Sequence, residues 1–223
     1  MSAIKAKILE RERELWLEQV AKLSGKVAAG KVQPATLRAF YKVSPDRTFQ
    51  INFNKDVDSI SQAENLLGVN RLAQVFGLGL ALCKVPLVGT TPQWALAKFI
   101  SNPFDAELLT AEQNAANALF NARLKFHTQQ ADRFDQVLAS RYMMATTEEA
   151  TYSVKTLPMN ANFLMVGGEE NYIEFKLPLT GDFSTALLAP TTYAFYVVVQ
   201  AETIMIAADE ANTKDSIAAF LRA

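Results

Sequence analysis

The stretch QVFGLGLALCKVPLVG, from Gln74 to Gly89, decides the fold because its glycines fit either a phosphate-binding loop or a buried strand. A dinucleotide-binding loop starting at Gly77 would need glycine or alanine at position 82, where a leucine stands. Such a loop also opens a helix, and a helix starting here would meet Pro86 at once. A Walker A loop needs Gly-Lys-Ser or Gly-Lys-Thr, and neither tripeptide occurs in the chain. The stretch is therefore interpreted as a buried strand.

The two faces of this predicted strand differ in size. One face carries large side chains, namely Phe76, Leu78, Leu80 and Leu82. The other carries mostly small ones, namely Val75, Gly77, Gly79, Ala81 and Cys83. Small residues on one face let another element approach the strand closely. We expect that element to be a second sheet or an N-terminal helix.

Further strand signals follow the same period of two. RTFQINFN places Phe49, Ile51 and Phe53 on one face, and similar patterns recur at 93–100, 122–128 and through most of 151–206. An alanine-rich segment at 105–122 is predicted to be helical in part. Strands do not alternate regularly with full helices, which disfavours a doubly wound sheet. The predicted fold is mainly β with an N-terminal α-helix: an antiparallel, jelly-roll-like β-sandwich with helical insertions, whose domain spans 34–223.

Residues 1–33 are predicted to form an amphipathic N-terminal arm, helical from Ala3 to about Ala28. Its apolar stripe supplies the candidate subunit-contact residues Leu9, Trp16, Val20 and Leu23. Its basic residues supply the candidate nucleic-acid-facing set Lys5, Lys7, Arg11 and Arg13. Glutamates dilute this basic set, so a solvated helix face is the alternative interpretation.

Charge is unevenly distributed along a chain whose net charge is only −1. Residues 1–47 hold ten Lys or Arg against five acids, whereas residues 148–223 hold four against ten. A basic arm can bind nucleic acid or the acidic surface of a neighbouring copy. A solvated surface with uneven charge explains the same pattern.

No constellation of catalytic, cofactor-binding or metal-ligating residues is predicted. His127 is the single histidine and Cys83 the single cysteine, and no Gly-x-Ser-x-Gly motif occurs. Four acid pairs, Asp56/Asp58, Glu148/Glu149, Glu169/Glu170 and Asp209/Glu210, lie among turn-forming residues. We therefore expect no enzyme and no cofactor, with His127 a surface or hydrogen-bonded side chain and Cys83 a core residue.

The order of these features resembles a bacteriophage virion structural protein, in particular small viral jelly-roll capsid proteins. The resemblance rests on the charged N-terminal helix, on RTFQINFNKDVDSISQAENLLGVNRLAQVFGLGLALCKV, and on the strand-rich half ending TYAFYVVVQAETIMI. It implies a shell protein whose partners are copies of itself, other virion proteins and, weakly and non-specifically, the genome. It also implies a product made in the host cytoplasm and found in the virion.

Two features of the chain agree with that location. Two other functions are alternatives to that of a shell protein. There is no run of 18 apolar residues to span a membrane, and the N-terminus lacks the apolar region of a signal peptide. The first competing function is a soluble β-sandwich binding module for carbohydrate or nucleic acid, without catalysis. The second is an enzyme whose carboxylates converge in a cleft.

Overall fold

The computed structural model describes residues 32–54, 67–68, 71–100, 102–128, 131–143, 157–178, 187–188 and 190–207. The predicted N-terminal helix lies outside the described residues. The same is true of the candidate subunit-contact residues, Leu9, Trp16, Val20 and Leu23, and of the candidate nucleic-acid-facing residues, Lys5, Lys7, Arg11 and Arg13. Those assignments remain predictions.

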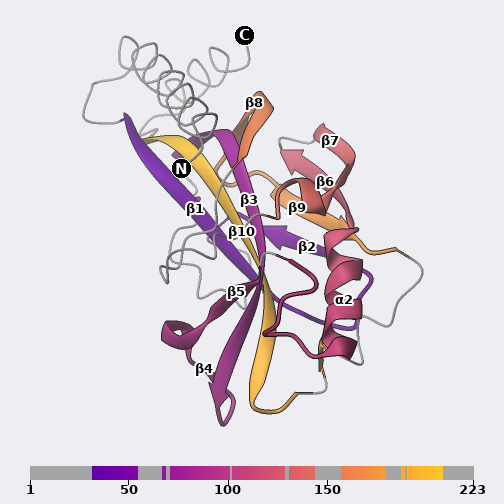
Figure 1. The fold of residues 1–223 in the computed structure, drawn as a ribbon. Coiled ribbons are helices and arrows are strands. Elements are labelled where there is room, and N and C mark those ends of the chain that lie inside the picture. The colour runs from indigo at the N-terminus through magenta and orange to yellow at the C-terminus, as the bar shows by residue number, and fades with distance from the viewer. Residues whose placement is uncertain are drawn as a thin grey trace, which may run out of the picture.

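Two antiparallel sheets make up the described chain (Figure 1). In the six-stranded sheet, β1 (Val32–Lys42) pairs with β10 (Tyr193–Ala207), which pairs with β3 (Arg71–Val88). The second edge of β3 pairs in turn with β8 (Leu157–Val166), β5 (Lys98–Ile100) and β4 (Thr91–Pro92). The four-stranded sheet has the order β2 (Thr48–Asn52), β9 (Asn171–Lys176), β6 (Arg123–Thr128) and β7 (Ala131–Leu138). The prediction of a mainly antiparallel β protein is confirmed.

The pairs formed by the eight longer strands are nested. β1 pairs with β10, β2 with β9, β3 with β8, and β6 with β7. The first of these strands therefore meets the last, the second meets the seventh, and so on inwards. Two further pairs, β10 with β3 and β9 with β6, join these hairpin-like pairs side by side. The described strands thus form nested antiparallel pairs that are distributed over two sheets.

The sheets share one apolar core. β3 contributes Leu78, Leu80 and Leu82, and the four-stranded sheet contributes Phe126 and Phe175, all fully buried. These residues alternate with outward-facing ones, as a period of two requires. The same alternation places Phe49 and Ile51 of β2 in the core, as predicted.

The Gln74–Gly89 stretch lies in strand β3 as far as Val88, as predicted; the strand is buried in its middle and becomes exposed at its end, from Pro86 to Val88. Ala81 and Cys83 lie on the face opposite the core, in a second cluster. There, burial raises the pKa of the Cys83 thiol to about 12. The prediction for Val75 is wrong, because this side chain belongs to the main core with Leu78. A bulge between Val75 and Gly77 adds one residue to β3 relative to β10. The residues of β3 up to Val75 therefore lie on the opposite face of the sheet from the one that strict alternation predicts.

The prediction of one strand over 93–100 is also wrong in its first half. Residues Trp94–Leu96 form the 3-10 helix η2, and only Lys98–Ile100 pair with β3 as β5. The Trp94 ring lies 4.6 Å from that of Phe40 and 4.7 Å from that of Tyr196, measured between centroids. Packing Trp94 onto the outer surface of the six-stranded sheet requires this departure from a strand.

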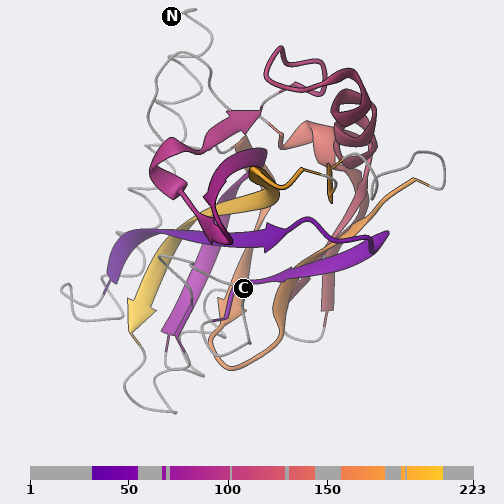
Figure 2. The ribbon, with the colours of Figure 1, turned by 90° about the horizontal axis from the view of Figure 1, so that it is seen from below.

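Helical structure is confined to short pieces of the described chain. Helix α2 (Thr110–Phe120) confirms the helical part of the alanine-rich segment, and the 3-10 helix η3 (Ala139–Arg141) follows β7. In both views η2 and β5 lie on one side of the molecule and α2 on the other (Figures 1 and 2). Within the described residues, no helix has the length and apolar character needed to cross a bilayer.

Candidate functional site

Exposed apolar side chains concentrate in the segment that leaves the end of β3 and leads to α2, which we call the 88–109 segment. Val88, Leu96, Phe104 and Leu109 are 69%, 64%, 64% and 65% exposed. They are four of the six large apolar side chains that are exposed among the described residues; the other two are Leu138 and Leu188. Single exposed apolar residues are ordinary, so it is their frequency within this one segment that makes the segment a candidate for interaction.

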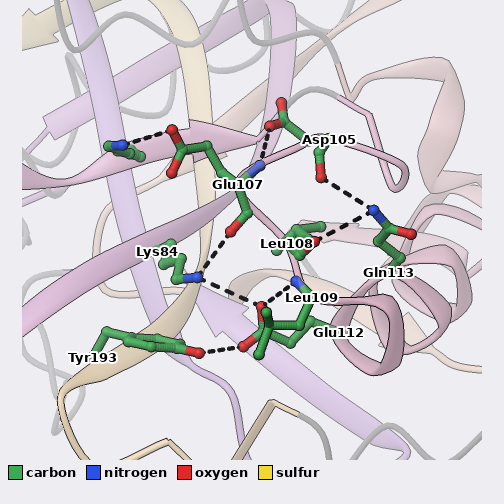
Figure 3. A network of polar contacts seen from close by, with 9 residues as sticks. Lys84, Asp105, Glu107, Leu108, Leu109, Glu112, Gln113 and Tyr193 are labelled. Atoms are coloured by element: carbon green, nitrogen blue, oxygen red, sulfur yellow. Dashed lines mark hydrogen bonds and ion pairs between the residues drawn. The ribbon is translucent and has the colours of Figure 1, made fainter.

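A partly buried polar network fixes the end of this segment to the six-stranded sheet (Figure 3). We call its members Lys84, Glu107, Glu112 and Tyr193 the Lys84 clamp. Lys84 Nζ on β3 donates a hydrogen bond of 2.8 Å to the backbone oxygen of Glu107 and lies 3.5 Å from Glu112 Oε2. The same ammonium group lies 4.0 Å from the ring centroid of Tyr193, a cation–π distance. Lys84 therefore joins three separate parts of the chain.

Glu112 is the buried anion of the clamp, with a side chain only 3% exposed. Its Oε1 accepts a 2.5 Å hydrogen bond from the Tyr193 hydroxyl, and its Oε2 accepts one of 2.9 Å from the Leu109 backbone N–H. Leucine has no side-chain acceptor for the N-terminus of α2, so the carboxylate supplies half of a capping box alone. Glu112 thus sets both where α2 begins and where it docks.

Weaker contacts hold the residues before α2. Asp105 Oδ1 accepts a 2.9 Å hydrogen bond from the Glu107 N–H, which closes a local turn. The Glu107 carboxylate lies 2.6 Å from Lys98 Nζ, and this hydrogen bond lowers the pKa of Glu107. The lysine and glutamate side chains are each about half exposed, so this pair adds little stability. The buried contacts of Glu112 are the ones that position the segment.

The environment of Tyr193 gives a prediction for alkaline pH. Burial and the hydrogen bond to Glu112 raise the pKa of Tyr193 to about 12. The unfolded chain releases this proton near pH 10, so stability is unaffected below pH 10 and falls as the pH rises towards 12. Phenolate absorbance at 295 nm should show a component near pH 12 that Tyr193→Phe removes. Glu112→Gln should shift this component to lower pH; an unchanged titration would contradict the assigned cause.

His127 lies on the outer face of the four-stranded sheet, where its partners were not predicted. Its Nδ1 donates a 2.7 Å hydrogen bond to Asp132 Oδ1, its Nε2 lies 3.8 Å from Glu170 Oε2, and its ring stacks on Tyr172 at 4.8 Å. The hydrogen bond from His127 lowers the pKa of Asp132. The interpretation of His127 as a hydrogen-bonded surface side chain is therefore confirmed.

One of the four predicted acid pairs can be placed. Glu169 and Glu170 lie at the turn between β8 and β9, as predicted. The pairs Asp56/Asp58, Glu148/Glu149 and Asp209/Glu210 lie outside the described residues. Within the described residues, no three His, Cys, Asp or Glu side chains are grouped in a way that could hold a metal ion.

The Lys84 clamp was missed by sequence reasoning, although one signal was present. Lys84 is the only charged residue between Arg71 and Lys98. A lone charge in an otherwise apolar run is expensive to bury, so it calls for a buried partner. The identity of that partner required the fold.

The comparisons with known proteins assign no relative: no family model, no curated protein and no solved structure matches the chain.

Proposed function

We propose that this chain is a self-assembling structural protein of a virion, which forms or decorates a viral shell and has no catalytic role. The nested strand pairing is the observation that carries the proposal. A jelly roll is a ribbon of eight strands wound into two sheets, and the eight longer strands pair first with last, second with seventh, third with sixth and fourth with fifth. We therefore propose the jelly-roll fold, with β4, β5 and α2 inserted between its third and fourth strands.

The 88–109 segment supports the proposal because it offers apolar surface held in a defined position. The Lys84 clamp anchors the segment to β3 and β10, so its exposed side chains would not need to be ordered on association. A preorganised surface loses less conformational entropy when it binds. In the proposed shell this segment contacts a different surface of a neighbouring copy, as in a ring or closed shell.

Charge supports self-association as well. The basic residues 1–47 and the acidic residues 148–223 would attract each other between neighbouring copies. The proposed partners of the arm are neighbouring copies and, non-specifically, the genome. The candidate contact residues of the arm remain predictions.

The first test is the size of the purified full-length protein. Size-exclusion chromatography with light scattering, followed by negative-stain microscopy, should show rings or closed shells at low salt. High salt should shrink them if the charged ends contribute, because salt screens exposed charges. A monomer at every concentration and salt would sink the proposal and favour a soluble binding module.

Replacing apolar side chains of the 88–109 segment should weaken assembly without unfolding the protein. We expect Val88→Ser/Leu96→Ser/Phe104→Ser to weaken association by about 100-fold or more, because each buried side chain of this size contributes about 1.5–3 kcal/mol. The matched control is Leu138→Ser, which removes an exposed apolar side chain outside the segment. Equal assembly by the triple variant and the control, measured by light scattering, would exclude this surface.

A further inference from the structure

The outer face of the four-stranded sheet is a polar surface arranged in three rows across the strands. The first row holds Thr48, Lys176 and Arg123, and the second holds Gln50, Glu174 and Lys125. The third holds Asn52, Tyr172, His127 and Asp132. Rows on one face of a sheet are about 6.6 Å apart, so the first and third lie about 13 Å from each other. We call this surface the outer face below.

The charges of the outer face cancel in number but are separated in space. Three cations, Arg123, Lys125 and Lys176, oppose three carboxylates, Asp132, Glu170 and Glu174, giving 3 − 3 = 0 with His127 neutral. In the middle row, Lys125 Nζ lies 3.8 Å from Glu174 Oε1 and also 3.8 Å from Asp132 Oδ1 of the third row, so it partly neutralises both. Two cations occupy the first row, and two carboxylates lie at the third row and the turn beside it. The face is therefore a dipole that runs along the strands.

Each end of this dipole holds charge that the described residues do not neutralise well. Arg123 and Lys176 lie directly opposite each other on neighbouring strands, and like charges in this position are destabilising. Arg123 donates to the neutral amide oxygen of Gln136 at 2.7 Å. At the other end Glu170 is 76% exposed, and its Oε2 lies 3.8 Å from His127 Nε2. Glu169, its neighbour in the turn and outside this count, is also exposed.

The β7 edge of the four-stranded sheet does not favour the addition of another strand. β7 is the outermost described strand, and its pairing with β6 shifts register twice, around Phe126. Gln136 adopts a left-handed φ of 61° beside one of these shifts. Bulges of this kind twist an edge and hinder edge-to-edge pairing. A partner is therefore not expected along the β7 edge, which is one of the two edges of this sheet.

We propose that the outer face is a contact between two copies of this chain. A two-fold axis lies in the plane of the contact and crosses the strands at the row of Lys125 and Glu174. Arg123 and Lys176 of each copy then face the acidic end of the other copy, at two equivalent positions. The dipole is complementary to itself in this arrangement, which is what a two-fold contact requires. The inference rests on the proposed function and adds a second contact to that of the 88–109 segment.

A charge-swap experiment tests the pairing directly. The basic-end variant is Arg123→Glu/Lys176→Glu, and the acidic-end variant is Glu169→Lys/Glu170→Lys, which leaves the Asp132–His127 hydrogen bond in place. Each variant alone should repel itself, and its association constant at low salt should fall at least tenfold. An equimolar mixture of the two should recover the wild-type constant to within about threefold, because opposite ends then meet again. Sedimentation velocity measures the association of each variant and of the mixture.

Circular dichroism and thermal unfolding check that each variant is folded. Lys42→Glu/Arg141→Glu is the matched control, since it makes the same change in net charge at exposed residues of β1 and η3. It should associate as the wild type does. If the control weakens association as much as the basic-end variant, net charge is responsible and the proposed contact is excluded.

The remaining outcomes separate this contact from the proposed function. If the wild type assembles and the charge-swap variants assemble equally well, the contact is overturned and the proposed function stands. The same holds if the wild type assembles and the mixture of variants does not recover its association constant. A monomeric wild type overturns the proposed function itself. Inorganic phosphate is the probe for the other occupant. Calorimetry would then detect phosphate binding to the wild type and to the acidic-end variant but not to the basic-end variant. If the basic-end variant also associates as the wild type does, the outer face is an anion site and not a contact between copies.

Discussion

Replacing Glu112 with alanine should lower the free energy of unfolding by about 3–5 kcal/mol, the loss expected when one partner of a buried ion pair is removed. Lys84, whose side chain is 17% exposed, would lose the buried carboxylate that lies 3.5 Å from its Nζ. The Tyr193 hydroxyl and the Leu109 backbone N–H would each lose an acceptor. Urea denaturation followed by circular dichroism at pH 7 measures the change.

Three matched variants separate the charge of Glu112 from its hydrogen bonds. Glu112→Gln removes the charge and keeps one acceptor oxygen, for Tyr193 or for Leu109, so its loss should be smaller than that of Glu112→Ala. Lys84→Met/Glu112→Leu removes both charges and should cost less than Glu112→Ala, since no unpaired ion stays buried. Glu107→Ala breaks only an exposed pair and should cost less than about 1 kcal/mol. If Glu112→Ala costs no more than Glu107→Ala, the clamp does not hold the segment.

The strands of the core could be predicted because their alternation is local. Phe49 and Ile51 face the core for the same reason that Leu78, Leu80 and Leu82 do: each is two residues from the next apolar residue. The two glycines of the Gln74–Gly89 stretch did not obscure this pattern. The tests for a phosphate-binding loop failed on single residues, and such tests need no knowledge of the fold.

The errors arose where packing between distant segments changes the backbone. The bulge before Gly77 is a register shift against β10 between Glu202 and Thr203, more than a hundred residues further along the chain. Trp94 leaves its predicted strand to pack between Phe40 and Tyr196, which belong to two other strands. A period of two carries no information about either event, because both depend on which strands become neighbours.

The candidate sites were less accessible from the sequence than the fold. Lys84, Glu112 and Tyr193 are separated by 28 and 81 positions, so nothing local connects them. The dipole of the outer face is equally hidden, since Arg123 and Lys176 become neighbours only through the pairing of β6 with β9. The charged ends of the chain were visible in the sequence, because composition alone reveals them.

Replacing Phe175 with alanine should cost about 3–5 kcal/mol of unfolding free energy, the usual range for deleting a buried phenyl ring. Phe175 on β9 is fully buried and stacks on Phe49 of β2 at 4.9 Å between centroids. Phe49 stacks in turn on Tyr41 of β1 at 4.3 Å. The three rings therefore continue from the six-stranded sheet into the four-stranded one, beside the connection where the chain crosses between them.

The stack can be distinguished from simple filling of the core by a double-mutant cycle. Phe175→Leu keeps most of the apolar volume, so it should lose less than Phe175→Ala. Combined with Phe49→Leu it should show a coupling of about 0.5–1.5 kcal/mol, the value of an aromatic pair beyond its buried area. Urea denaturation of the four proteins measures this coupling. Additive losses would mean that the rings fill volume independently; coupling would mean that the two rings stabilise each other directly across the β2–β9 pair.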